Sequence, residues 1–443
     1  MLLLLAVLAT LALAWFRIGP VPEIVIHPSF SAIGPRTPVE VSLQEPRRGL
    51  STVQVEVLQE GKSTVLLEEA FEPRSFWSFW GGRTAAKTFP LEVGRETVSN
   101  LQEGEATIRV TAGRAPTWLR SPKPVSKELT LPVRLRPPRL ELTSGPNYAT
   151  QGGSGVVTYQ VGSSSARDGV QAGEWWFPGF PLPGGAPGDR FALFGAPYDL
   201  DDKDSIRLWV SDELGNIRET PFLDLYKLQP LRRDTIRLNT AFLERVVPLI
   251  QAESPEIQQT DDLLAGYLAI NGDLRRANGK ELNRLAGESR PEFLWQGPFR
   301  QLPGSQVMSS FADRRTYTFE GKEVDHQDHL GFDLASTRRA PVPASNGGDV
   351  VLAGYFGIYG STVVLDHGYG LMTLYAHLSS ISVEVGQSLS AGEIVGRTGQ
   401  TGLAGGDHLH FTMLIQGLAV NPVEWWDRGW ITNNVTSKLQ PPG

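Results

Sequence analysis

Histidine and aspartate residues in the last third of the chain have the types and spacing of a catalytic metal site. Six of the seven histidines lie within residues 326–410, and two motifs stand out, His329-Leu-Gly-Phe-Asp333 and His408-Leu-His410. A catalytic zinc ion takes about three protein ligands from His and carboxylate groups and leaves a fourth position open for water. His329, Asp333 and one of the pair His408 and His410 supply such a set.

The spacing of these residues predicts which of them share a face. In a β-strand residues i and i+2 point to the same side, so His408 and His410 are expected to project into one groove. Tyr375 and His377 are expected to share a face for the same reason. Gly331, between the first His and the Asp, predicts a bend that turns both side chains inward.

The order of the motifs resembles that of a known family. The chain carries H-x-x-x-D, then Tyr-Ala-His-Leu, then Gly-Asp-His-Leu-His-Phe, which is similar to the lysostaphin/LytM-type zinc metallopeptidases that cut the peptide part of peptidoglycan. The similarity extends from Phe311 to Trp430. Any one motif is weakly specific, whereas the ordered set is highly specific.

The resemblance implies a role for each matching residue and an antiparallel β groove as the fold. It implies zinc as the cofactor, with His329, Asp333 and His410 as the metal ligands. His377 and His408 match the two catalytic histidines of the family that are not ligands. Since no member of the set is substituted, the resemblance favours an active enzyme over the catalytically silent relatives that bind and activate an amidase.

The expected reaction is attack of a zinc-bound water on the scissile carbonyl with help from two histidines. His408 would orient or deprotonate the water, and His377 would stabilise the oxyanion or protonate the leaving amine. The reverse assignment of these two roles fits the sequence equally well. Tyr375 is a further candidate, either as a hydrogen-bond donor to the oxyanion or as a packed core residue.

Other chemistries have little support in the sequence. The chain has no Cys, which excludes a thiol nucleophile, a Cys-ligated zinc ion and disulfides. It has no H-E-x-x-H or G-x-S-x-G motif. A lipoyl-like carrier would need a Lys at a hairpin tip, and there is no Lys between Glu323 and Trp430. A net charge of −7, with no long basic run, argues against a nucleic-acid partner.

The N-terminal segment predicts a location outside the cytoplasm. Residues 2–16 are almost all apolar, somewhat fewer than the ~20 that span a bilayer unaided, and Arg17 follows them. The segment is interpreted as an inner-membrane anchor or a signal peptide. Both interpretations place the rest of the chain in the cell envelope, in the periplasm, where peptidoglycan lies. Protein regulators are possible and are not identified by the sequence.

The remaining residues predict a mainly β protein of several domains. The 32 Pro, 47 Gly and short alternating apolar runs favour strands and turns, and periodicity turns helical only near residue 230. The predicted parts are an anchor or signal segment over 1–20, a β-sandwich over 21–137, an immunoglobulin-like β-sandwich over 138–228, a helical linker over 229–295, the zinc metallopeptidase domain over 296–430 and a tail over 431–443.

Two questions stay open at this level. The helical linker could be a plain spacer or could lie across the groove and restrict access to it. An open groove would accept either a Gly-Gly bridge or a D-Ala–diaminopimelate crosslink, so the sequence does not identify the bond that is cut.

Overall fold

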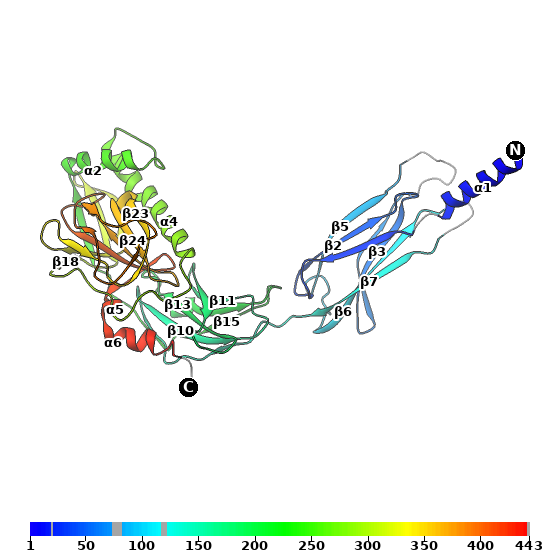
Figure 1. Ribbon diagram of the computed structural model, residues 1–443, viewed down its shortest axis with the longest axis horizontal. Helices are drawn as coiled ribbons and strands as arrows, with labels where there is room; N and C mark the ends of the chain where they lie inside the picture. The colour runs from blue at the N-terminus through cyan, green and yellow to red at the C-terminus, as the bar shows by residue number, and fades with distance from the viewer. Residues whose placement is uncertain (19–20, 73–81, 117–121, 441–443) are drawn as a thin grey trace. The chain divides into compact units, whose positions relative to one another are not determined.

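The computed structural model describes residues 1–18, 21–72, 82–116 and 122–440 of the chain. The contacts within it separate two compact units, and Figure 1 shows the elements of each. The first unit holds residues 1–138 with two short segments, 164–166 and 211–218. The second unit holds the remaining residues to the C-terminus, including every candidate site residue.

The first unit begins with a helix and continues as two β-sheets. Helix α1 is Leu2–Ile18. Among the described residues, no helix combines the length and apolar character needed to cross a membrane. The sheets have the orders β1-β2-β5 and β4-β3-β6-β7, and apolar residues of both meet in one core. Their strands are β1 (Glu23–Pro28), β2 (Thr37–Gln44), β3 (Leu50–Gln59), β4 (Lys62–Ala70), β5 (Ala86–Val93), β6 (Gly104–Arg114) and β7 (Val125–Val133).

The second unit starts with a seven-stranded sheet of order β15-β14-β11-β12-β13-β10-β8. Strand β12 pairs with β11 through its first half and with β13 through its second half, and the two halves of the sheet share one core. The immunoglobulin-like topology stays a prediction. The elements are β8 (Leu140–Leu142), β9 (Tyr148–Thr150), β10 (Ser154–Val161), β11 (Arg167–Ala172), β12 (Trp175–Pro181), β13 (Asp189–Gly195), η1 (Lys203–Ser205), β14 (Ile206–Ser211), β15 (Ile217–Pro221) and β16 (Leu225–Lys227).

A helical block follows, as the change of period predicts. The sequence offers Asn239 or Thr240 as the cap of the first helix; in the structure the side chain of Asn239 accepts a hydrogen bond from the backbone N–H of Phe242 and caps α2. Pro248 does not end α2; it lies on the exposed side, and the helix continues to Glu253. The elements of the block are β17 (Arg233–Leu238), α2 (Thr240–Glu253), α3 (Leu263–Ala269), the π-helical turn η2 (Ile270–Leu274) and α4 (Arg275–Gly287).

The catalytic region is built on one large antiparallel sheet of order β18-β21-β29-β25-β24-β23-β27, with β30 paired to β29. A smaller sheet, β22-β28-β26, packs with it around a shared core. The elements are β18 (Gln306–Ser309), β19 (Asp313–Phe319), β20 (Lys322–His329), β21 (Phe332–Ala335), β22 (Pro341–Pro343), β23 (Gly348–Tyr355), η3 (Gly357–Tyr359), β24 (Ser361–Asp366), β25 (Leu371–Ala376), β26 (Ser380–Ile381), β27 (Ser388–Leu389), β28 (Ile394–Arg397), β29 (Leu409–Ile415), β30 (Leu418–Val420), α5 (Pro422–Trp426), α6 (Arg428–Ile431) and the π-helical turn η4 (Thr432–Thr436).

The sequence predicts catalytic strands over 350–353, 362–365, 371–377, 382–385, 393–395 and 408–415, and observed strands overlap all of these ranges except one. The exception is 382–385, which was expected to be a strand and is a loop after β26. The described residues of the C-terminal tail, 431–440, are packed against the rest of the second unit. Val435 is buried, and Lys438 donates hydrogen bonds from Nζ to Asn147 Oδ1 at 2.9 Å and to the carbonyl of Val156 at 3.1 Å.

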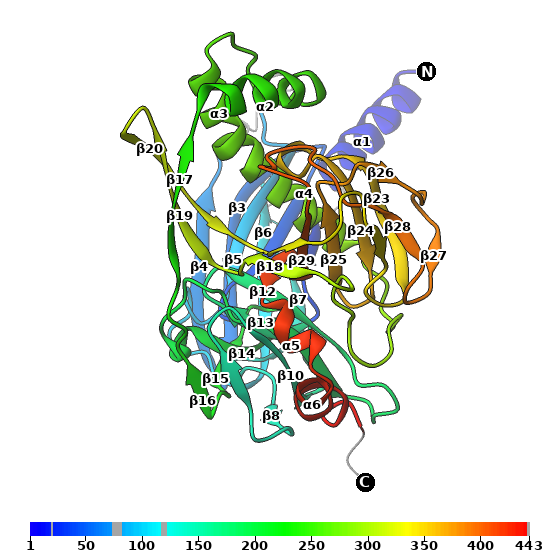
Figure 2. The same ribbon diagram turned by 90° about the vertical axis from the view of Figure 1, so that its left-hand side faces the viewer.

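The helical block is joined to the catalytic region by a third sheet, β17-β19-β20, in which β17 runs parallel to β19. Figure 2 shows this sheet and helices α2 to α4 beside the strands of the large sheet. Leu282 and Leu285 of α4 also share a core with Val364 and Leu374 of the large sheet. The block is therefore part of the fold that positions the site.

Candidate active site

Strand register brings the three predicted metal ligands together. Asp333 on β21 is paired with His410 on β29, and His329 ends β20 one short turn before β21. The Nε2 atom of His329 lies 2.9 Å from Asp333 Oδ1 and 3.0 Å from His410 Nδ1, and the last two atoms are 2.9 Å apart. His329 and His410 are buried. The predicted ligand set is thus one cluster in the structure.

Hydrogen bonds on the far side of each ring decide which nitrogen faces this cluster. The carbonyl of Ser310 accepts from His329 Nδ1 at 2.9 Å, which leaves the lone pair of Nε2 for the cluster. The hydroxyl of Thr412 donates to the Leu330 carbonyl and so accepts from His410 Nε2 at 3.0 Å. That arrangement leaves the lone pair of His410 Nδ1 for the cluster.

This donor set fits a metal ion. Two lone pairs and a carboxylate oxygen converge without a hydrogen to share among them, and such an arrangement is repulsive unless a cation lies between the atoms. In a tetrahedral site with bonds near 2.05 Å, ligand atoms are ~3.3 Å apart. The three atoms are slightly closer than that, so a small outward movement of the side chains would accommodate the ion.

Asp333 is held in its charged form by its neighbours. Burial alone would raise the pKa of the Asp333 carboxyl, but His329, His408 and His410, which can become positively charged by taking up a proton, hold it well below its usual range. Its second oxygen, Oδ2, accepts a hydrogen bond from Arg315 Nη2 at 3.1 Å. Arg315 therefore fixes the carboxylate with Oδ1 turned to the histidines.

Gly331 is required by the close approach of two segments. A Cβ atom at this position would lie 2.7 Å from the ring of His410 and 2.7 Å from the carbonyl of Phe411. The bend predicted between His329 and Asp333 is confirmed. The absence of a side chain at Gly331 lets the chain pass directly beside the third ligand.

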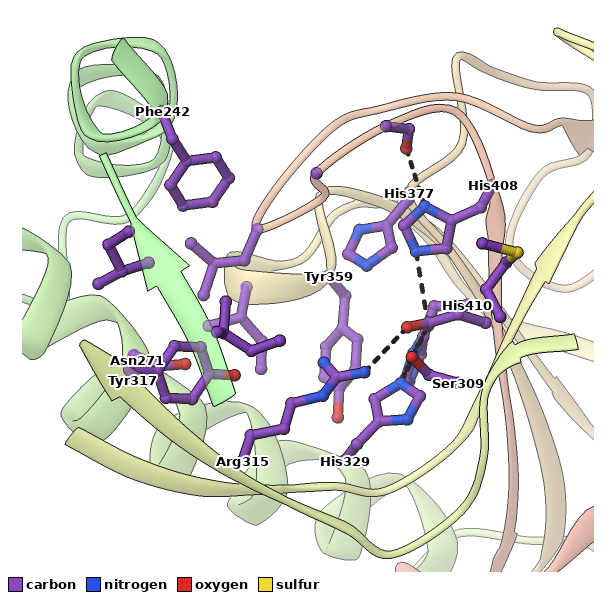
Figure 3. Close-up of a pocket in the computed structure, with 18 of the residues that line it drawn as sticks. Phe242, Asn271, Ser309, Arg315, Tyr317, His329, Tyr359, His377, His408 and His410 are labelled. Atoms are coloured by element: carbon purple, nitrogen blue, oxygen red, sulfur yellow. Dashed lines mark hydrogen bonds and ion pairs between the residues drawn. The ribbon is translucent and has the colours of Figure 1, made fainter. Parts of the chain in front are cut away.

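His377 and His408 lie on the other side of the cluster, with ring centroids 4.9 Å apart (Figure 3). The carbonyl of Thr401 accepts from His377 Nδ1 and the carbonyl of Gly406 accepts from His408 Nδ1, both at 2.8 Å. Each ring therefore keeps Nε2 as its free acceptor. His408 Nε2 is 3.4 Å from Asp333 Oδ1.

The surroundings shift the pKa values of His377 and His408 in opposite directions. Burial, reinforced by the nearby His408 and His410, lowers the pKa of His377 well below its usual value. Burial also acts to lower the pKa of His408, but the Asp333 carboxylate accepts a hydrogen bond from the protonated ring and stabilises its charge, which outweighs burial and raises that pKa. Paired groups whose pKa values are driven apart are typical of acid–base sites.

Tyr375 does not take the position expected for it. His377 follows the end of β25 and has φ of +60°, so the chain turns there and the two side chains do not share a face. Tyr375 lies in the core, 1 % exposed, and its hydroxyl accepts hydrogen bonds from the Ser345 N–H at 2.7 Å and from Thr373 at 3.0 Å. The proposed contact of Tyr375 with the oxyanion is wrong; its alternative, a packed core residue, is confirmed.

The tyrosine at the site is Tyr359. Its ring centroid is 5.7 Å from that of His410, and Figure 3 shows its hydroxyl end between Arg315 and His329. Its carbonyl accepts the backbone N–H of His377 at 2.8 Å. Sequence reasoning missed both Tyr359 and Arg315, because neither is in a motif with the histidines. Arg315 reaches the site through the β19–β20 hairpin that ends at His329, and Tyr359 through the turn η3.

The histidines line a pocket of about 560 Å³ whose other wall is the helical block. Figure 3 shows Phe242 of α2, Asn271 of η2 and Tyr317 of β19 across the pocket from His408 and His410. The block is therefore a wall of the pocket and not a spacer away from it.

Comparison with known proteins agrees with this geometry. The model of peptidase family M23 matches residues 327–422. The DD-carboxypeptidase/endopeptidase Mpg of Neisseria meningitidis serogroup B is 43% identical over 95 residues, which are 21% of this chain and 22% of Mpg. The peptidoglycan DD-endopeptidase ShyA of Vibrio cholerae is 31% identical over 161 residues, 36% of this chain and 34% of ShyA.

These matches span about a fifth to a third of the curated relatives. Among solved structures, the catalytic domain of lysostaphin from Staphylococcus simulans is 26% identical; the match covers 30% of this chain and 98% of that domain, with a TM-score of 0.26. The family match includes His329, Asp333, His377, His408 and His410. Residues 327–422 of this chain are a peptidase family M23 domain of the lysostaphin/LytM type.

Proposed function

We propose that the protein is a zinc-dependent endopeptidase that cleaves peptide crosslinks of bacterial peptidoglycan. The observation that carries this proposal is the convergence of His329 Nε2, Asp333 Oδ1 and His410 Nδ1, with two further histidines beside them. The M23 domain and the names of the two relatives, a DD-carboxypeptidase/endopeptidase and a peptidoglycan DD-endopeptidase, support the same substrate class.

The three ligand residues would hold the ion and keep it at one place in the pocket. Zinc bound by three such ligands supplies a Lewis acid for a carbonyl oxygen and lowers the pKa of water from 15.7 to about 7. Thr412, Ser310 and Arg315 would keep the ligand atoms oriented through the hydrogen bonds described above.

His377 and His408 would move the protons of the reaction. Both present Nε2 as an acceptor, and both line the pocket that the substrate carbonyl would enter. One would take a proton from the attacking water and the other would donate one to the leaving amine.

We also propose that the protein acts outside the cytoplasm, in the cell envelope, and that its N-terminal segment associates with the inner membrane. The location of the substrate and the apolar sequence of residues 2–16 support this proposal. Fractionation of cells that produce the full chain, with residues 21–443 alone as the comparison, tests it. Recovery of both in the cytoplasmic fraction would contradict it.

Digestion of purified sacculi tests the proposed reaction. The zinc-loaded protein should release muropeptides in which crosslinked dimers are replaced by monomers, with the glycan bonds intact, as identified by mass spectrometry. Cleaved glycan, or release of whole stem peptides from the glycan, would assign the chain to another class of hydrolase. Activity only in the presence of an added amidase would assign it to the silent activators.

A further inference from the structure

Three arginines outside the matched M23 region line the pocket that holds the histidines: Arg237 of β17, which is exposed, and two that are partly buried, Arg275 and Arg315. Arg315 comes from β19, and Arg275 is the first residue of α4 in the helical block. None of the three lies within residues 327–422, so the family match assigns them no role.

Arg275 is held in place by its own helix. Its Nε donates to the carbonyl of Asn271 at 3.1 Å, and its Nη2 donates to Asn271 Oδ1 at 2.6 Å. Asn271 is fully buried and donates from Nδ2 to Asp325 Oδ2 at 2.7 Å, which fixes the amide in turn. The guanidinium is therefore rigid, and its partner Asn271 is neutral.

The charge of Arg275 has no acidic partner in the described part of the chain, where no carboxylate lies within ion-pair distance of it. Arg315 differs, because its Nη2 contacts Asp333 Oδ2 and its charge is shared with the metal ligand. The other acids of the pocket already have donors: Asp328 accepts from the hydroxyl of Tyr198 at 2.8 Å, and Asp407 accepts from that of Thr398 at 2.7 Å.

Arg275 lines the same pocket as Tyr359 and the metal ligands. Burial raises the pKa of the Tyr359 hydroxyl, and the charge of Arg275 acts in the opposite direction, as expected for neighbouring groups. The ring of Tyr359 is in turn 5.7 Å from that of His410. A fixed guanidinium in such a position suits a planar carboxylate, which can accept two hydrogen bonds from it.

We infer that Arg275 binds a free carboxylate of the substrate peptide beside the bond that is cut. This inference rests on the proposed function. It selects crosslinks in which the carbon that bears the scissile nitrogen also bears a carboxylate, as in a D-Ala–diaminopimelate crosslink. A glycine bridge has no side-chain carboxylate to offer. The helical block then takes part in substrate recognition.

The test compares two crosslinked peptide dimers that differ only in this carboxyl group, which is free in one and amidated in the other. The zinc-loaded full chain should cleave the free form with a kcat/KM about 10- to 100-fold higher, the size expected for a hydrogen bond to a charged group. Arg275→Gln should lower kcat/KM for the free form to that of the amidated form and leave the amidated form unchanged.

Arg276→Gln is the matched control, because Arg276 is the next residue, is 69% exposed and pairs with Asp273. It should keep the full preference. Arg275→Lys keeps the charge and should restore part of the preference.

Equal cleavage of the two dimers by the unaltered protein would overturn the inference and leave the proposed function standing. Retained preference in Arg275→Gln would also overturn it. Loss of both cleavages in the Gln and Lys variants would make Arg275 a residue of the fold and overturn it as well. If the unaltered zinc-loaded protein cleaves neither dimer, the proposed function fails first.

Discussion

The Nε2 atom of His329 and the Nδ1 atom of His410 lie 3.0 Å apart, and both present lone pairs to each other. Ser310 and Thr412 fix this arrangement by accepting the hydrogens of the opposite ring nitrogens. Two neutral imidazoles gain nothing from such a contact by themselves. Together with the ionised Asp333 they form a site that a divalent cation would stabilise.

Removal of one ligand should remove the metal. His329→Ala and Asp333→Ala should each reduce zinc from about one ion per chain to well below that, because three protein ligands are needed to hold it. His326→Ala is the control, since His326 is exposed and bonded to Glu323 at 2.7 Å. Metal analysis of purified proteins is the measurement, and full zinc retention in both ligand variants would refute the assignment.

The two other histidines should be needed for turnover and not for metal. His377→Ala and His408→Ala should each keep zinc and lower kcat by about 10²- to 10⁴-fold, the range for lost acid–base assistance. Steady-state kinetics on a crosslinked peptide, with zinc content measured in parallel, checks this. If His408→Ala also strips the metal, then His408 and not His410 is the ligand.

Tyr375 should matter for stability alone. Tyr375→Phe removes the acceptor of the buried Ser345 N–H and should lower the free energy of unfolding by about 1–3 kcal/mol. The kcat of Tyr375→Phe should be unchanged, since the hydroxyl that it removes lies in the core. Tyr359→Phe is the comparison, because that hydroxyl lies at the pocket, and it should change kcat more than stability. A large loss of kcat in Tyr375→Phe with unchanged thermal unfolding would contradict the structure.

Glu424 should make stability depend on pH. Burial is the main cause that raises its pKa from 4.5 to about 8, against two hydrogen bonds from Ser154 that act to lower it. The folded state therefore binds this proton more tightly than the unfolded state. The stabilisation is fully present below pH 4.5 and is lost as pH rises through about 8.

The expected slope from Glu424 is at most ~1.4 kcal/mol per pH unit between these two pKa values. Glu424→Gln cannot ionise and should remove this part of the pH dependence. Thermal unfolding of both proteins from about pH 5 to pH 9 measures the difference. Parallel profiles for the two proteins would show that Glu424 keeps an ordinary pKa.

The sequence could predict the members of the ligand cluster because each lies in a short motif, although the pairing of β21 with β29 is what brings them together. The i, i+2 spacing of His408 and His410 predicts that they share a face, and Gly331 predicts the bend between His329 and Asp333. Runs of apolar residues predict β24 and β29. The cap of α2 by Asn239 is equally local, since it depends on a side chain and a backbone N–H three residues apart.

The other features of the site depend on contacts between separate segments of the chain or on a single backbone angle, and the sequence did not predict them. The positive φ of His377 turns its side chain away from the face that holds Tyr375. No pattern of residues in the sequence predicts that turn. Arg275 reaches the pocket as part of the helical block, whose strand β17 pairs in parallel with β19, about 80 residues later in the sequence. Periodicity describes each of these elements alone and carries no information on that pairing.

Removal and return of the metal during digestion of sacculi tests the central claim most directly. The protein is stripped with a chelator, dialysed and titrated with zinc, and the released muropeptides are identified by mass spectrometry. The account predicts no cleavage without metal and a rate of crosslink cleavage that rises in proportion to bound zinc up to about one ion per chain. Asp333→Ala should stay inactive throughout. Undiminished crosslink cleavage by the metal-free protein, or no cleavage by the fully loaded one, would contradict the account.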